Sequence, residues 1–444
     1  MPPHTVTTTT PPGPHLPAVA QTAALLHDPV GFLHRCRHRH GDVFTTRVVG
    51  VPGLVYVGTA ELARRVFATD RDVGRAGEAR RDFLESLVGP RSLLCLDGEA
   101  WTRQRRFLGP AFHSRHAQRY REQMAAIAAD HACRWPLDKP FALRPRMQAI
   151  TLEVILRVVL GVRDSDRVER LRTLLPRLLA ASDSGGLLAL LPTPARGRLE
   201  RALVRLPGSP VARFSALLAA TDEILYDEIA RRRAARDRDG ATDVLSTLLA
   251  ARDEHGSEMS DAELRDGLMT LLVAGHETTA TALAWAFERL VRHPDVLARI
   301  GDGDGRYLDA VARETLRTRP VFAEMPRVLV EPLELGGYRI PAGWYVSPAA
   351  PLLHDDPHEF PAPHAFRPER FLADTFSTQA WIPFGGGRRH CTGSQFALLE
   401  MTAVIPQVLA HLRLRPTDPA PEKVRIRNGT LAPARGARVL AQAR

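Results

Sequence analysis

Apolar residues recur at helical spacing over most of the chain. The clearest stretches predict helices at residues 113–133, 147–160, 167–181, 212–237, 262–292 and 306–319. Short runs rich in β-branched residues and bounded by glycine predict strands at residues 45–49 and 53–57. Strand-like segments return at residues 327–332, 334–340 and 344–347. The pattern predicts a fold that is mainly α with a small β region.

The amino-terminal segment has a different character. It is rich in proline and threonine up to Pro14, and it has neither an apolar core nor a positively charged leading region. This composition predicts a flexible tail and lead-in over residues 1–27, not a signal peptide. No run of roughly eighteen consecutive apolar residues occurs anywhere in the chain. We therefore expect a cytoplasmic protein without a membrane anchor.

Composition and charge narrow the expected partners. The chain has 444 residues, of which 44% are hydrophobic, and a net charge of +10. No zinc-binding spacing, helix-turn-helix or aromatic-interleaved basic patch accompanies this charge, so nucleic acid is not the expected partner. The four cysteines show no CxxC spacing and are expected to stay reduced; they are Cys36, Cys95, Cys133 and Cys391.

Cys391 is set apart by its neighbours. Three glycines and two arginines precede it, Gly393 follows it, and apolar residues at helical spacing then resume. Glycines allow a tight turn whose N–H groups point inward. Such N–H groups, the arginines and the positive end of a helix all favour a thiolate over a thiol. From these residues alone Cys391 is a metal ligand, a nucleophile or an ordinary structural cysteine.

The pattern Phe-x-x-Gly-x-Arg-x-Cys-x-Gly at residues 384–393 resembles the haem-binding loop of the cytochrome P450 family. In that family the cysteine thiolate is the proximal ligand of a haem b iron. The resemblance makes Cys391 the metal ligand. It also implies further haem contacts from Phe384, Gly385, Arg389 and Gly393.

A second motif lies in a predicted helix that spans residues 269–287. Its centre reads Ala-Gly-His-Glu-Thr-Thr, a poor interior for a packed helix, because threonine hydroxyls compete for backbone carbonyls and glycine weakens the helix. Such a break is typical of functional sites. The segment is similar to the distal helix of the family. There Ala274 would contact the haem, Thr278 would hydrogen-bond dioxygen and water, and Glu277 would help to relay protons.

The third motif is a Glu-x-x-Arg pair. Glu314 and Arg317 share one helix face, which by itself indicates only a solvated ion pair. With Arg370 of the later Phe-Arg-Pro-Glu-Arg-Phe segment, the pair resembles the buried triad of the family. The resemblance implies that this triad supports the cysteine loop and takes no part in the chemistry.

The fourth motif concerns the haem propionates. Trp101 and Arg105 lie on one helix face and resemble the Trp-x-x-x-Arg pair that binds a propionate. An indole N–H and a guanidinium suit a carboxylate. Arg327 and Arg389 match two further propionate arginines of the family. Arg103 and Arg106 are expected as surface charge.

The resemblance also implies a substrate pocket roofed by a loop over residues 82–94. The expected pocket residues are Phe83, Leu84, Leu87, Val88, Leu271, Ala274, Val321, Phe322, Ala323 and Leu431. They are mainly apolar, so a lipophilic small molecule is expected as the substrate. Two departures, His390 directly before the cysteine and Glu277 in place of aspartate, look like the branch that includes fatty-acid and terpenoid oxidisers.

The implied activity is that of a haem-thiolate monooxygenase, which hydroxylates or epoxidises a terpenoid, polyketide or fatty acid of secondary metabolism. Electrons are expected from NAD(P)H through a ferredoxin reductase and an acidic ferredoxin, which the basic charge would attract. Because the motifs must converge on one cofactor, we expect residues 28–444 to form one domain, and the protein to be a monomer. A peroxide-driven peroxygenase and a non-catalytic haem or lipid binder are the alternatives.

Overall fold

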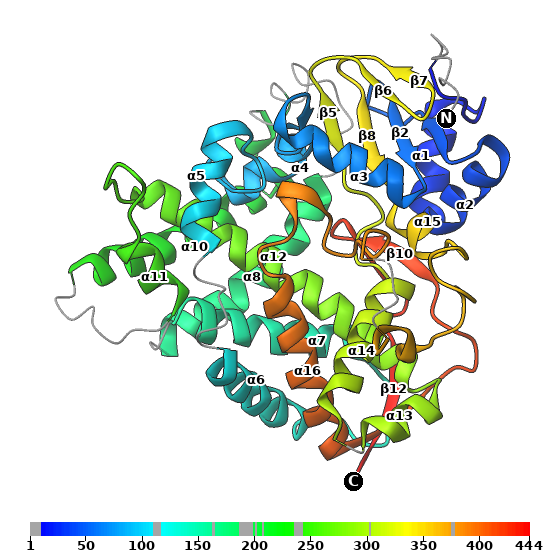
Figure 1. The fold of residues 1–444 in the computed structure, drawn as a ribbon. Coiled ribbons are helices and arrows are strands. Elements are labelled where there is room, and N and C mark those ends of the chain that lie inside the picture. Colours follow the sequence, from blue (N-terminus) through cyan, green and yellow to red (C-terminus); the bar gives the residue numbers. More distant parts are fainter. Residues whose placement is uncertain are drawn as a thin grey trace. The chain divides into compact units, whose positions relative to one another are not determined.

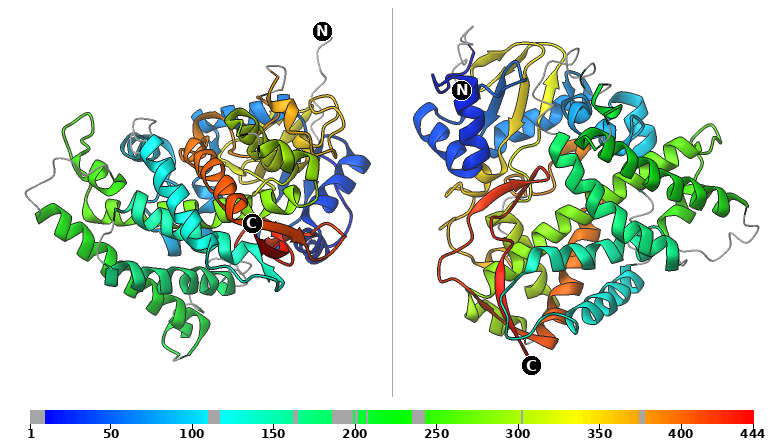
Figure 2. Two further views of the ribbon diagram at one scale, coloured as in Figure 1. Left: turned by 90° about the horizontal axis from the view of Figure 1, so that it is seen from below. Right: turned by 180° about the vertical axis from the view of Figure 1, so that it is seen from behind.

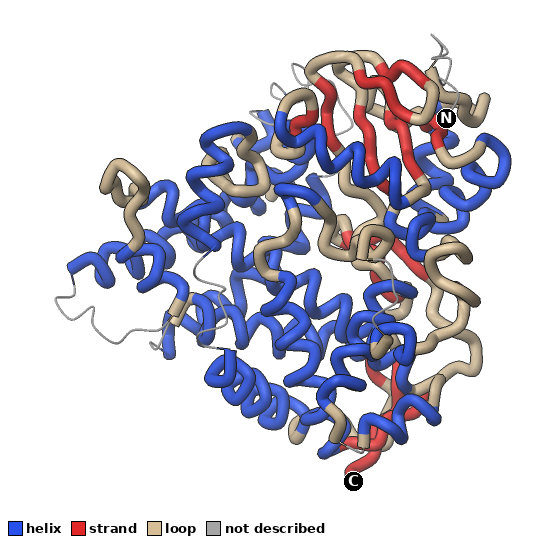
Figure 3. The backbone as a smooth tube through the Cα atoms, in the orientation of Figure 1, coloured by secondary structure: helices blue, strands red, loops and turns tan. Residues whose placement is uncertain are grey.

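The computed structural model describes residues 10–109, 117–161, 165–185, 199, 202–206, 208–234, 243–301, 303–373 and 378–444. The chain divides into two compact units. Unit 1 comprises Met1–Ala79, Met124–Ile150 and Thr278–Arg444, and unit 2 comprises Arg80–Gln123 and Thr151–Glu277. Helices predominate, and every strand of the described ranges belongs to unit 1 (Figures 1 and 3). This confirms the predicted mainly α fold with a small β region.

The largest sheet of unit 1 has five strands in the order β1-β2-β8-β5-β3. Their bounds are β1 Val43–Thr46, β2 Leu54–Val57, β8 Tyr345–Pro348, β5 Arg327–Leu329 and β3 Gly74–Arg75. Strands β2 and β8 are parallel, and the other neighbours are antiparallel. The sheet therefore joins the amino-terminal strands to segments late in the chain.

Both faces of strand β2 are buried because apolar side chains cover each of them. Leu54 and Tyr56 pack with Phe32 and Leu33 of helix α2 (Pro29–His40). Alternate residues face the other way, and Val55 and Val57 pack in a second cluster that includes a valine of helix α3 (Ala60–Ala68). Side chains of a strand alternate between its two faces, so one short strand contributes to two cores.

The segment before the sheet is partly structured. Pro11 and Pro12 accept hydrogen bonds from the hydroxyl and the backbone N–H of Thr45, at 2.9 and 2.8 Å. Residues Ala18–His27 form helix α1. The sequence predicted a flexible lead-in up to residue 27, but these described residues have defined structure.

Three smaller sheets complete the β structure of unit 1. One is the hairpin of β6 (Leu333–Leu335) and β7 (Tyr338–Ile340), which turns at Gly336 and Gly337 with φ of +58° and +83°. The expectation of one strand over residues 334–340 was wrong, because two glycines in the left-handed region reverse the chain there. The other two sheets pair β10 (Val424–Arg427) with β11 (Thr430–Pro433), and β12 (Arg438–Ala443) with β4 (Phe141–Ala142) and β9 (Leu412–Pro416).

Helix α14 is central to the helical part of unit 1. It spans Gly305–Thr318 and begins at Asp304, whose carboxylate accepts the Arg306 N–H. It packs against α16 (Ser394–His411), as Figures 1 and 2 show, and against the 3-10 turn η6 (Pro368–Phe371). Nearby helices of this unit are α13 (Pro294–Ile300) and α15 (Ala350–His354).

The described residues of unit 2 form helices and loops, without a strand among them. Its elements are α4 (Glu78–Val88, whose first two residues belong to unit 1), α5 (Gly98–Leu108), α8 (Ser165–Gly185), α10 (Pro210–Ala234) and α11 (Val244–Ala250). Helices α8 and α10 pack together, and Arg167 binds Glu228 across them at 2.7 Å. Helix α4 replaces most of the loop predicted over residues 82–94. The apolar residues of this segment recur at helical spacing, and no glycine occurs in the helix, which ends just before Gly89.

The chain passes from one unit to the other within four helices. These are α4, α6 (Ala117–Ala132), α7 (Leu143–Val154) and the 30-residue α12 (Asp261–Leu290). A π-helical turn, η4, continues α7 over Ile155–Val159. The predicted helix at 113–133 begins outside the described residues. Across the described ranges, no helix combines the length and the apolar character that a bilayer span requires.

Candidate functional site

Glycine is required at the positions before Cys391 for two reasons: two of these residues have positive φ, and helix α3 lies too close for a side chain. Gly385 and Gly387 have φ of +72° and +62°, which L side chains rarely adopt. A Cβ atom on Gly386 would lie 2.4 Å from the ring of Phe67, and one on Gly387 would lie 2.8 Å from the Phe67 carbonyl oxygen. The loop is therefore shaped against α3, and larger residues at these positions would push it away.

Backbone hydrogen bonds close the loop on both sides of the cysteine. The Gly385 N–H donates to the Ile382 carbonyl at 3.0 Å, and the Cys391 N–H donates to the Phe384 carbonyl at 3.0 Å. Helix α16 begins three residues after Cys391, with Gly393 as its N-cap. This placement of the cysteine at a helix N-terminus is the one that the sequence predicts.

The thiol of Cys391 is exposed, and this fits a metal ligand. The exposed Arg388 and the partly exposed Arg389 belong to the 3-10 turn η7 (Gly387–Arg389) directly before it. By contrast, burial raises the pKa of Cys36 and of Cys95 to about 11, which disfavours their thiolates. The charge and the accessibility around Cys391 suit the thiolate ligand of a haem iron.

Helix α12 carries the predicted Glu277 and Thr278, and it has one partly exposed stripe. The stripe follows helical spacing through Leu271, Ala274, Gly275 and Thr278, whereas Glu277 is buried. A Cβ on Gly275 would lie 2.6 Å from the Ile155 side chain of η4, which explains the glycine within the helix. Two of the expected pocket residues, Leu271 and Ala274, thus share a helix face with Thr278.

The pair on α5 has the predicted common helix face. The Arg105 guanidinium lies 5.5 Å from the ring of the buried Trp101. Arg103 differs from the expectation of surface charge. It donates to Asp253 at 2.9 Å and also binds Glu263, so it connects α5 to the segment before α12 and to the first turn of α12 itself.

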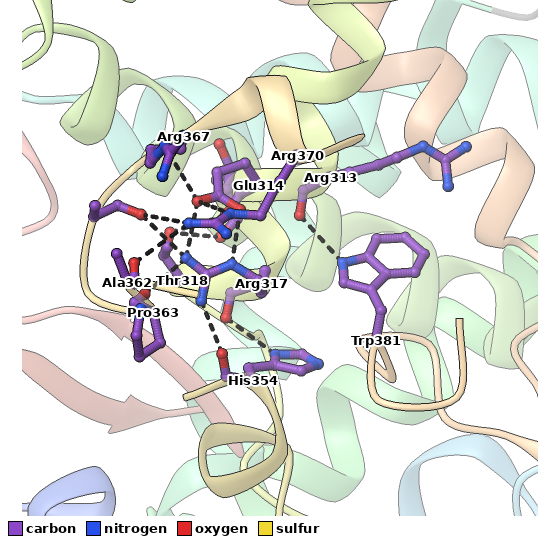
Figure 4. Close-up of polar contacts among 12 residues, drawn as sticks. Arg313, Glu314, Arg317, Thr318, His354, Ala362, Pro363, Arg367, Arg370 and Trp381 are labelled. Carbon is purple, nitrogen blue, oxygen red and sulfur yellow. Dashed lines mark hydrogen bonds and ion pairs between the residues drawn. The ribbon is translucent and has the colours of Figure 1, made fainter. Parts of the chain in front are cut away.

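The three residues of the predicted triad are in contact in unit 1 (Figure 4). Arg317 donates to both oxygens of Glu314, at 2.7 and 2.8 Å, and both side chains are fully buried. Arg370 donates to the same carboxylate at 3.2 Å. Arg317 also reaches the carbonyls of His354 and Pro363, each at 2.8 Å. The bidentate ion pair and these further hydrogen bonds together offset the desolvation free energy of the two buried charges.

Arg327 has a partner that the sequence analysis did not identify. Its guanidinium binds Asp70 through Nε at 2.6 Å and Nη2 at 3.1 Å, and its Nη1 donates to the Met325 and Pro326 carbonyls. Both charged side chains are almost completely buried. These four bonds leave one of the five guanidinium N–H groups for a further acceptor.

The expected pocket residues occupy several environments. On α4, Leu87 and Val88 are buried, Leu84 is half-buried, and Phe83 is 56% exposed. In unit 1 the Leu431 N–H donates to the Val321 carbonyl at 2.7 Å, so these two residues lie together. Phe322 beside them is 40% exposed, and Ala323 is half-buried.

The sequence analysis did not identify three polar residues: Glu324, which is partly exposed, and Glu400 and His354, which are fully buried. Glu324, between Ala323 and Met325, accepts the hydroxyl of Tyr56 at 2.5 Å, and burial raises the pKa of its carboxyl. Glu400 of α16 is fully buried, and its carboxylate has no hydrogen-bond partner among the described residues. Burial holds the pKa of Glu400 well above its usual range. His354 bonds at both ring nitrogens. No motif or spacing marks any of the three.

The residues predicted to surround a haem come from both units. Trp101, Arg105, Ala274 and Glu277 belong to unit 2, and the others, from Thr278 to Gly393, belong to unit 1. The triad and the cysteine loop lie within unit 1, whereas the α12 stripe begins in unit 2 and reaches unit 1 at Thr278.

Comparisons with known proteins agree with this geometry. The sequence matches the family model for cytochrome P450 over residues 11–302 and 304–441. Cytochrome P450 135B1 of Mycobacterium tuberculosis is 42% identical over 443 residues, which cover 98% of this chain and 91% of that protein. Cytochrome P450 135A1 of the same species is 37% identical over 440 residues, which cover 98% of this chain and 95% of that protein.

A solved structure shows the same fold. Retinoic acid bound CYP120A1, a cyanobacterial protein, matches with a TM-score of 0.82 and 25% sequence identity, over 99% of this chain and 100% of that one. The family match includes Cys391 and its loop. The chain belongs to the cytochrome P450 family, whose members are haem-thiolate monooxygenases that use dioxygen.

Proposed function

We propose that this cytochrome P450 hydroxylates or epoxidises a lipophilic small molecule, such as a terpenoid, polyketide or fatty acid of secondary metabolism. The observation that carries the proposal is the exposed Cys391 thiol in a glycine turn shaped against Phe67. When bound, haem supplies the oxidising power, so that one oxygen atom of dioxygen enters the substrate and the other leaves as water. The chain itself must ligate the iron, hold protons and orient the substrate.

The haem would be held by an iron ligand, by charged side chains at its propionates, and by small residues that leave room for it. Cys391 would ligate the iron, with Phe384, Gly385 and Gly393 around it. Trp101 and Arg105 would bind one propionate, and the stacking of the guanidinium over the indole supports this role, because it aligns two donors on one helix face. Arg389 and the remaining N–H of Arg327 would bind propionate oxygens. Ala274 would face the haem plane.

Glu277 and Thr278 would handle protons. The hydroxyl of Thr278 belongs to the partly exposed stripe of α12, where it would orient dioxygen and water by hydrogen bonds. Glu277 is only 4% exposed and directly precedes Thr278. A buried acid next to an accessible hydroxyl supports a relay in which Glu277 passes protons toward the Thr278 face.

The substrate assignment rests on the apolar character of the expected pocket residues. Leu271 and Ala274 on α12, and Val321 with Leu431 in unit 1, would present hydrocarbon surface. Apolar walls with few polar groups favour a lipophilic ligand. The retinoic acid bound relative supports the same class, because retinoic acid is a lipophilic molecule.

Electron transfer would need a protein partner. We infer that NAD(P)H reduces a ferredoxin reductase, which reduces an acidic ferredoxin that docks near the cysteine loop. The net charge of +10 and the exposed Arg388 beside that loop support an acidic partner. A monomer of one domain in the cytoplasm is consistent with this scheme.

The experiment that tests the proposed function has two steps. The haem-loaded protein is titrated with fatty acids, terpenoids, polyketides and retinoic acid, and displacement of iron-bound water is followed as a Soret shift. Any lipophile that shifts the band is then turned over with a ferredoxin system under isotopically labelled dioxygen. We expect a product that carries one labelled oxygen atom. Binding without any labelled product would contradict a monooxygenase and favour the non-catalytic binder.

A pair of variants tests the pocket. Phe322 and Val330 are both exposed apolar residues after α14, at 40% and 44% exposure, but only Phe322 is an expected pocket residue. Phe322→Ala should weaken binding of the lipophile that gives the Soret shift, whereas Val330→Ala should leave its affinity unchanged. Equal affinities in both variants would remove Phe322 from the pocket.

A further inference from the structure

His354 is the last residue of α15, and its ring is bonded at both nitrogens in the interior of unit 1. Its Nδ1 lies 3.0 Å from the Arg317 carbonyl oxygen, and its Nε2 lies 3.0 Å from the backbone nitrogen of Ile382. Its own carbonyl accepts Nη1 of Arg317 at 2.8 Å (Figure 4). The residue is completely buried. One side chain therefore joins the last turn of α14 to the segment that leads into the cysteine loop.

The two partners fix the protonation of the ring. The Arg317 carbonyl can only accept a hydrogen bond, so Nδ1 must carry the proton. The Ile382 N–H can only donate, so Nε2 must be unprotonated. A second proton on the ring would place two N–H groups against each other. The geometry thus admits one neutral tautomer and excludes the imidazolium.

The connection continues to the cysteine through the backbone. Ile382, which His354 contacts through its N–H, accepts the Gly385 N–H at its carbonyl, at 3.0 Å. Phe384, within that turn, accepts the Cys391 N–H at 3.0 Å. A short series of hydrogen bonds thus leads from the buried Glu314–Arg317 pair, through the imidazole of His354, to the backbone of Cys391.

Packing leaves the ring little freedom to move. The ring of Phe360 meets it edge-on, with centroids 6.3 Å apart, and the Arg317 guanidinium lies over the same Phe360 ring. Ile382 and the neighbouring Leu353 belong to one apolar cluster with Phe67, the residue that shapes the glycine turn. Burial, and then the charge of Arg317, lower the pKa of His354 to about 3, against the weaker opposing effects of the hydrogen bond to the Arg317 carbonyl and of the Asp355 charge. The ring therefore stays neutral at physiological pH.

We propose that His354 is a positioning residue for the haem ligand: its neutral ring ties the Ile382 amide to α14 and thereby sets the position of the Cys391 loop. The inference rests on the proposed role of Cys391 as the iron ligand. It concerns no chemical step, because His354 reaches Cys391 only through the backbone. It extends the support of the loop beyond the Glu314–Arg317–Arg370 triad to a residue on another helix.

Two substitutions separate the two bonds of the ring. The amide of glutamine extends far enough to offer its oxygen near the position of Nε2, so His354→Gln should keep an acceptor for the Ile382 N–H. The shorter amide of asparagine reaches only the position of Nδ1, so His354→Asn should leave that N–H buried without an acceptor. The carbonyl of residue 354 still binds Arg317 in both variants.

The readout is the ferrous carbon-monoxide spectrum of the holoenzyme. In His354→Asn we expect the ratio of the thiolate-ligated form to the form that has lost the thiolate to fall about tenfold, the effect of one unsatisfied buried N–H group. His354→Gln should retain most of the thiolate-ligated form, and the reduction potential of the iron should follow the same order. Wild-type spectra and potentials in both variants would overturn the proposal.

Controls separate this role from general stability and from the ligand assignment. Leu33→Ala removes a fully buried side chain elsewhere in unit 1, so it should lower the unfolding temperature without changing the spectral ratio. An equal change of the ratio in Leu33→Ala would show a merely structural effect and overturn the proposal. The wild-type spectrum tests thiolate ligation by itself, so failure of the proposed function is seen separately.

The protonation state of the His354 ring can also be measured in the wild-type protein, so this test does not depend on whether a variant folds. Nitrogen NMR of histidine-labelled protein in its diamagnetic carbon-monoxide form should show an imidazole with the proton on Nδ1 and with an Nε2 that accepts a hydrogen bond, and this ring should stay neutral down to about pH 5. If no histidine shows this state, the bonds that carry the proposal do not exist.

Discussion

Cys391 differs from the other three cysteines in its surroundings. Cys36 is buried within an apolar cluster and Cys95 is buried as well, whereas Cys133 is exposed near the end of α6, without a glycine turn or a helix N-terminus after it. Only the Cys391 loop combines glycines at positive φ, adjacent arginines and the start of a helix. A soft, ionised sulfur is what a haem iron requires of a thiolate ligand.

Substitution of Cys391 tests whether its thiolate is the iron ligand. Cys391→Ser should abolish the long-wavelength Soret band of the ferrous carbon-monoxide complex, because a serine hydroxyl is neither soft nor readily ionised. The exposed Cys133 offers a matched control, and Cys133→Ser should leave the band unchanged. A band of normal intensity in Cys391→Ser would mean that another cysteine ligates the iron.

Thr278→Ala tests the proposed proton relay. Alanine favours the helix, so α12 should remain folded, but the hydroxyl that orients dioxygen and water is lost. Positioned proton transfer contributes about 10²–10⁴-fold to rate. Product per NAD(P)H consumed should therefore fall sharply while hydrogen peroxide rises. Glu277→Gln should slow turnover as a whole and preserve more of the coupling. Normal coupling in Thr278→Ala would contradict the relay, and a peroxide-driven enzyme would be indifferent to the change.

Among single residues, the sequence was informative where a local motif exists. Glu314, Arg317 and Arg370 could be paired because the family motif connects them, and the structure brings the three side chains together. Asp70 and His354 could not be found in this way. Their partners lie far away in sequence, at Arg327 for Asp70 and at Ile382 for His354, and one residue type without a fixed spacing carries no signal.

At the scale of elements, periodicity predicted the long helices well and the short segments poorly. The helix expected at 262–292 is α12, Asp261–Leu290, and the one at 306–319 is α14, Gly305–Thr318. The family resemblance implies a loop over residues 82–94, whereas the apolar spacing at Phe83, Leu84, Leu87 and Val88 favours a helix, and α4 follows the spacing. Short strands depend on partners from distant parts of the chain, so their ends were less accurate.

Helix α16 contains a carboxyl group whose burial should be measurable. Glu400 is protonated in the folded state over a wider pH range than in the unfolded chain, since burial raises its folded pKa. Below the unfolded pKa, near 4.3, both states hold the proton and no stability is lost. Above it only the unfolded state ionises, so the folded state loses roughly 1.4 kcal/mol per pH unit until the folded pKa is reached.

Glu400→Gln should remove this dependence. The unfolding temperature of the variant should rise relative to that of wild type as the pH increases from about 4.5 to 8. Glu122 of α6 is exposed, so Glu122→Gln should show no such trend. A constant difference between Glu400→Gln and wild type at all pH values would mean that the carboxyl finds a partner when the protein folds.

On the scale of the whole molecule, the chain has a net positive charge although many of its arginines form ion pairs with its own carboxylates. Several arginines bind buried acids, as Arg232 does with Glu228 at 2.8 Å and Arg265 with Asp266 at 3.0 Å. A sequence shows how many charges are present but not which of them are already paired in the fold. The net charge acts at long range all the same, and it governs encounter with a partner more than stability.

Electron delivery by an acidic ferredoxin should therefore depend on salt. Exposed charges are screened over about 8–10 Å at 0.1–0.15 M salt, so donor-limited turnover should fall about tenfold or more as salt rises from low to moderate concentration. Arg388→Glu, beside Cys391, should weaken this dependence. Arg413→Glu makes the same change of charge at an exposed site on β9 and should have a smaller effect. Turnover independent of salt would exclude electrostatic steering.

The close fit of Gly386 and Gly387 to Phe67 has a consequence for biosynthesis. Phe67 is synthesised early, and Gly386 and Gly387 are synthesised late. The turn that presents Cys391 therefore cannot pack against Phe67 until almost the whole polypeptide has been made. Contacts between such distant segments also form slowly, because a long loop must close first. Haem capture is therefore a late event in the maturation of this protein, and chains released before residue 391 can neither form the ligand nor compete for the cofactor at this site.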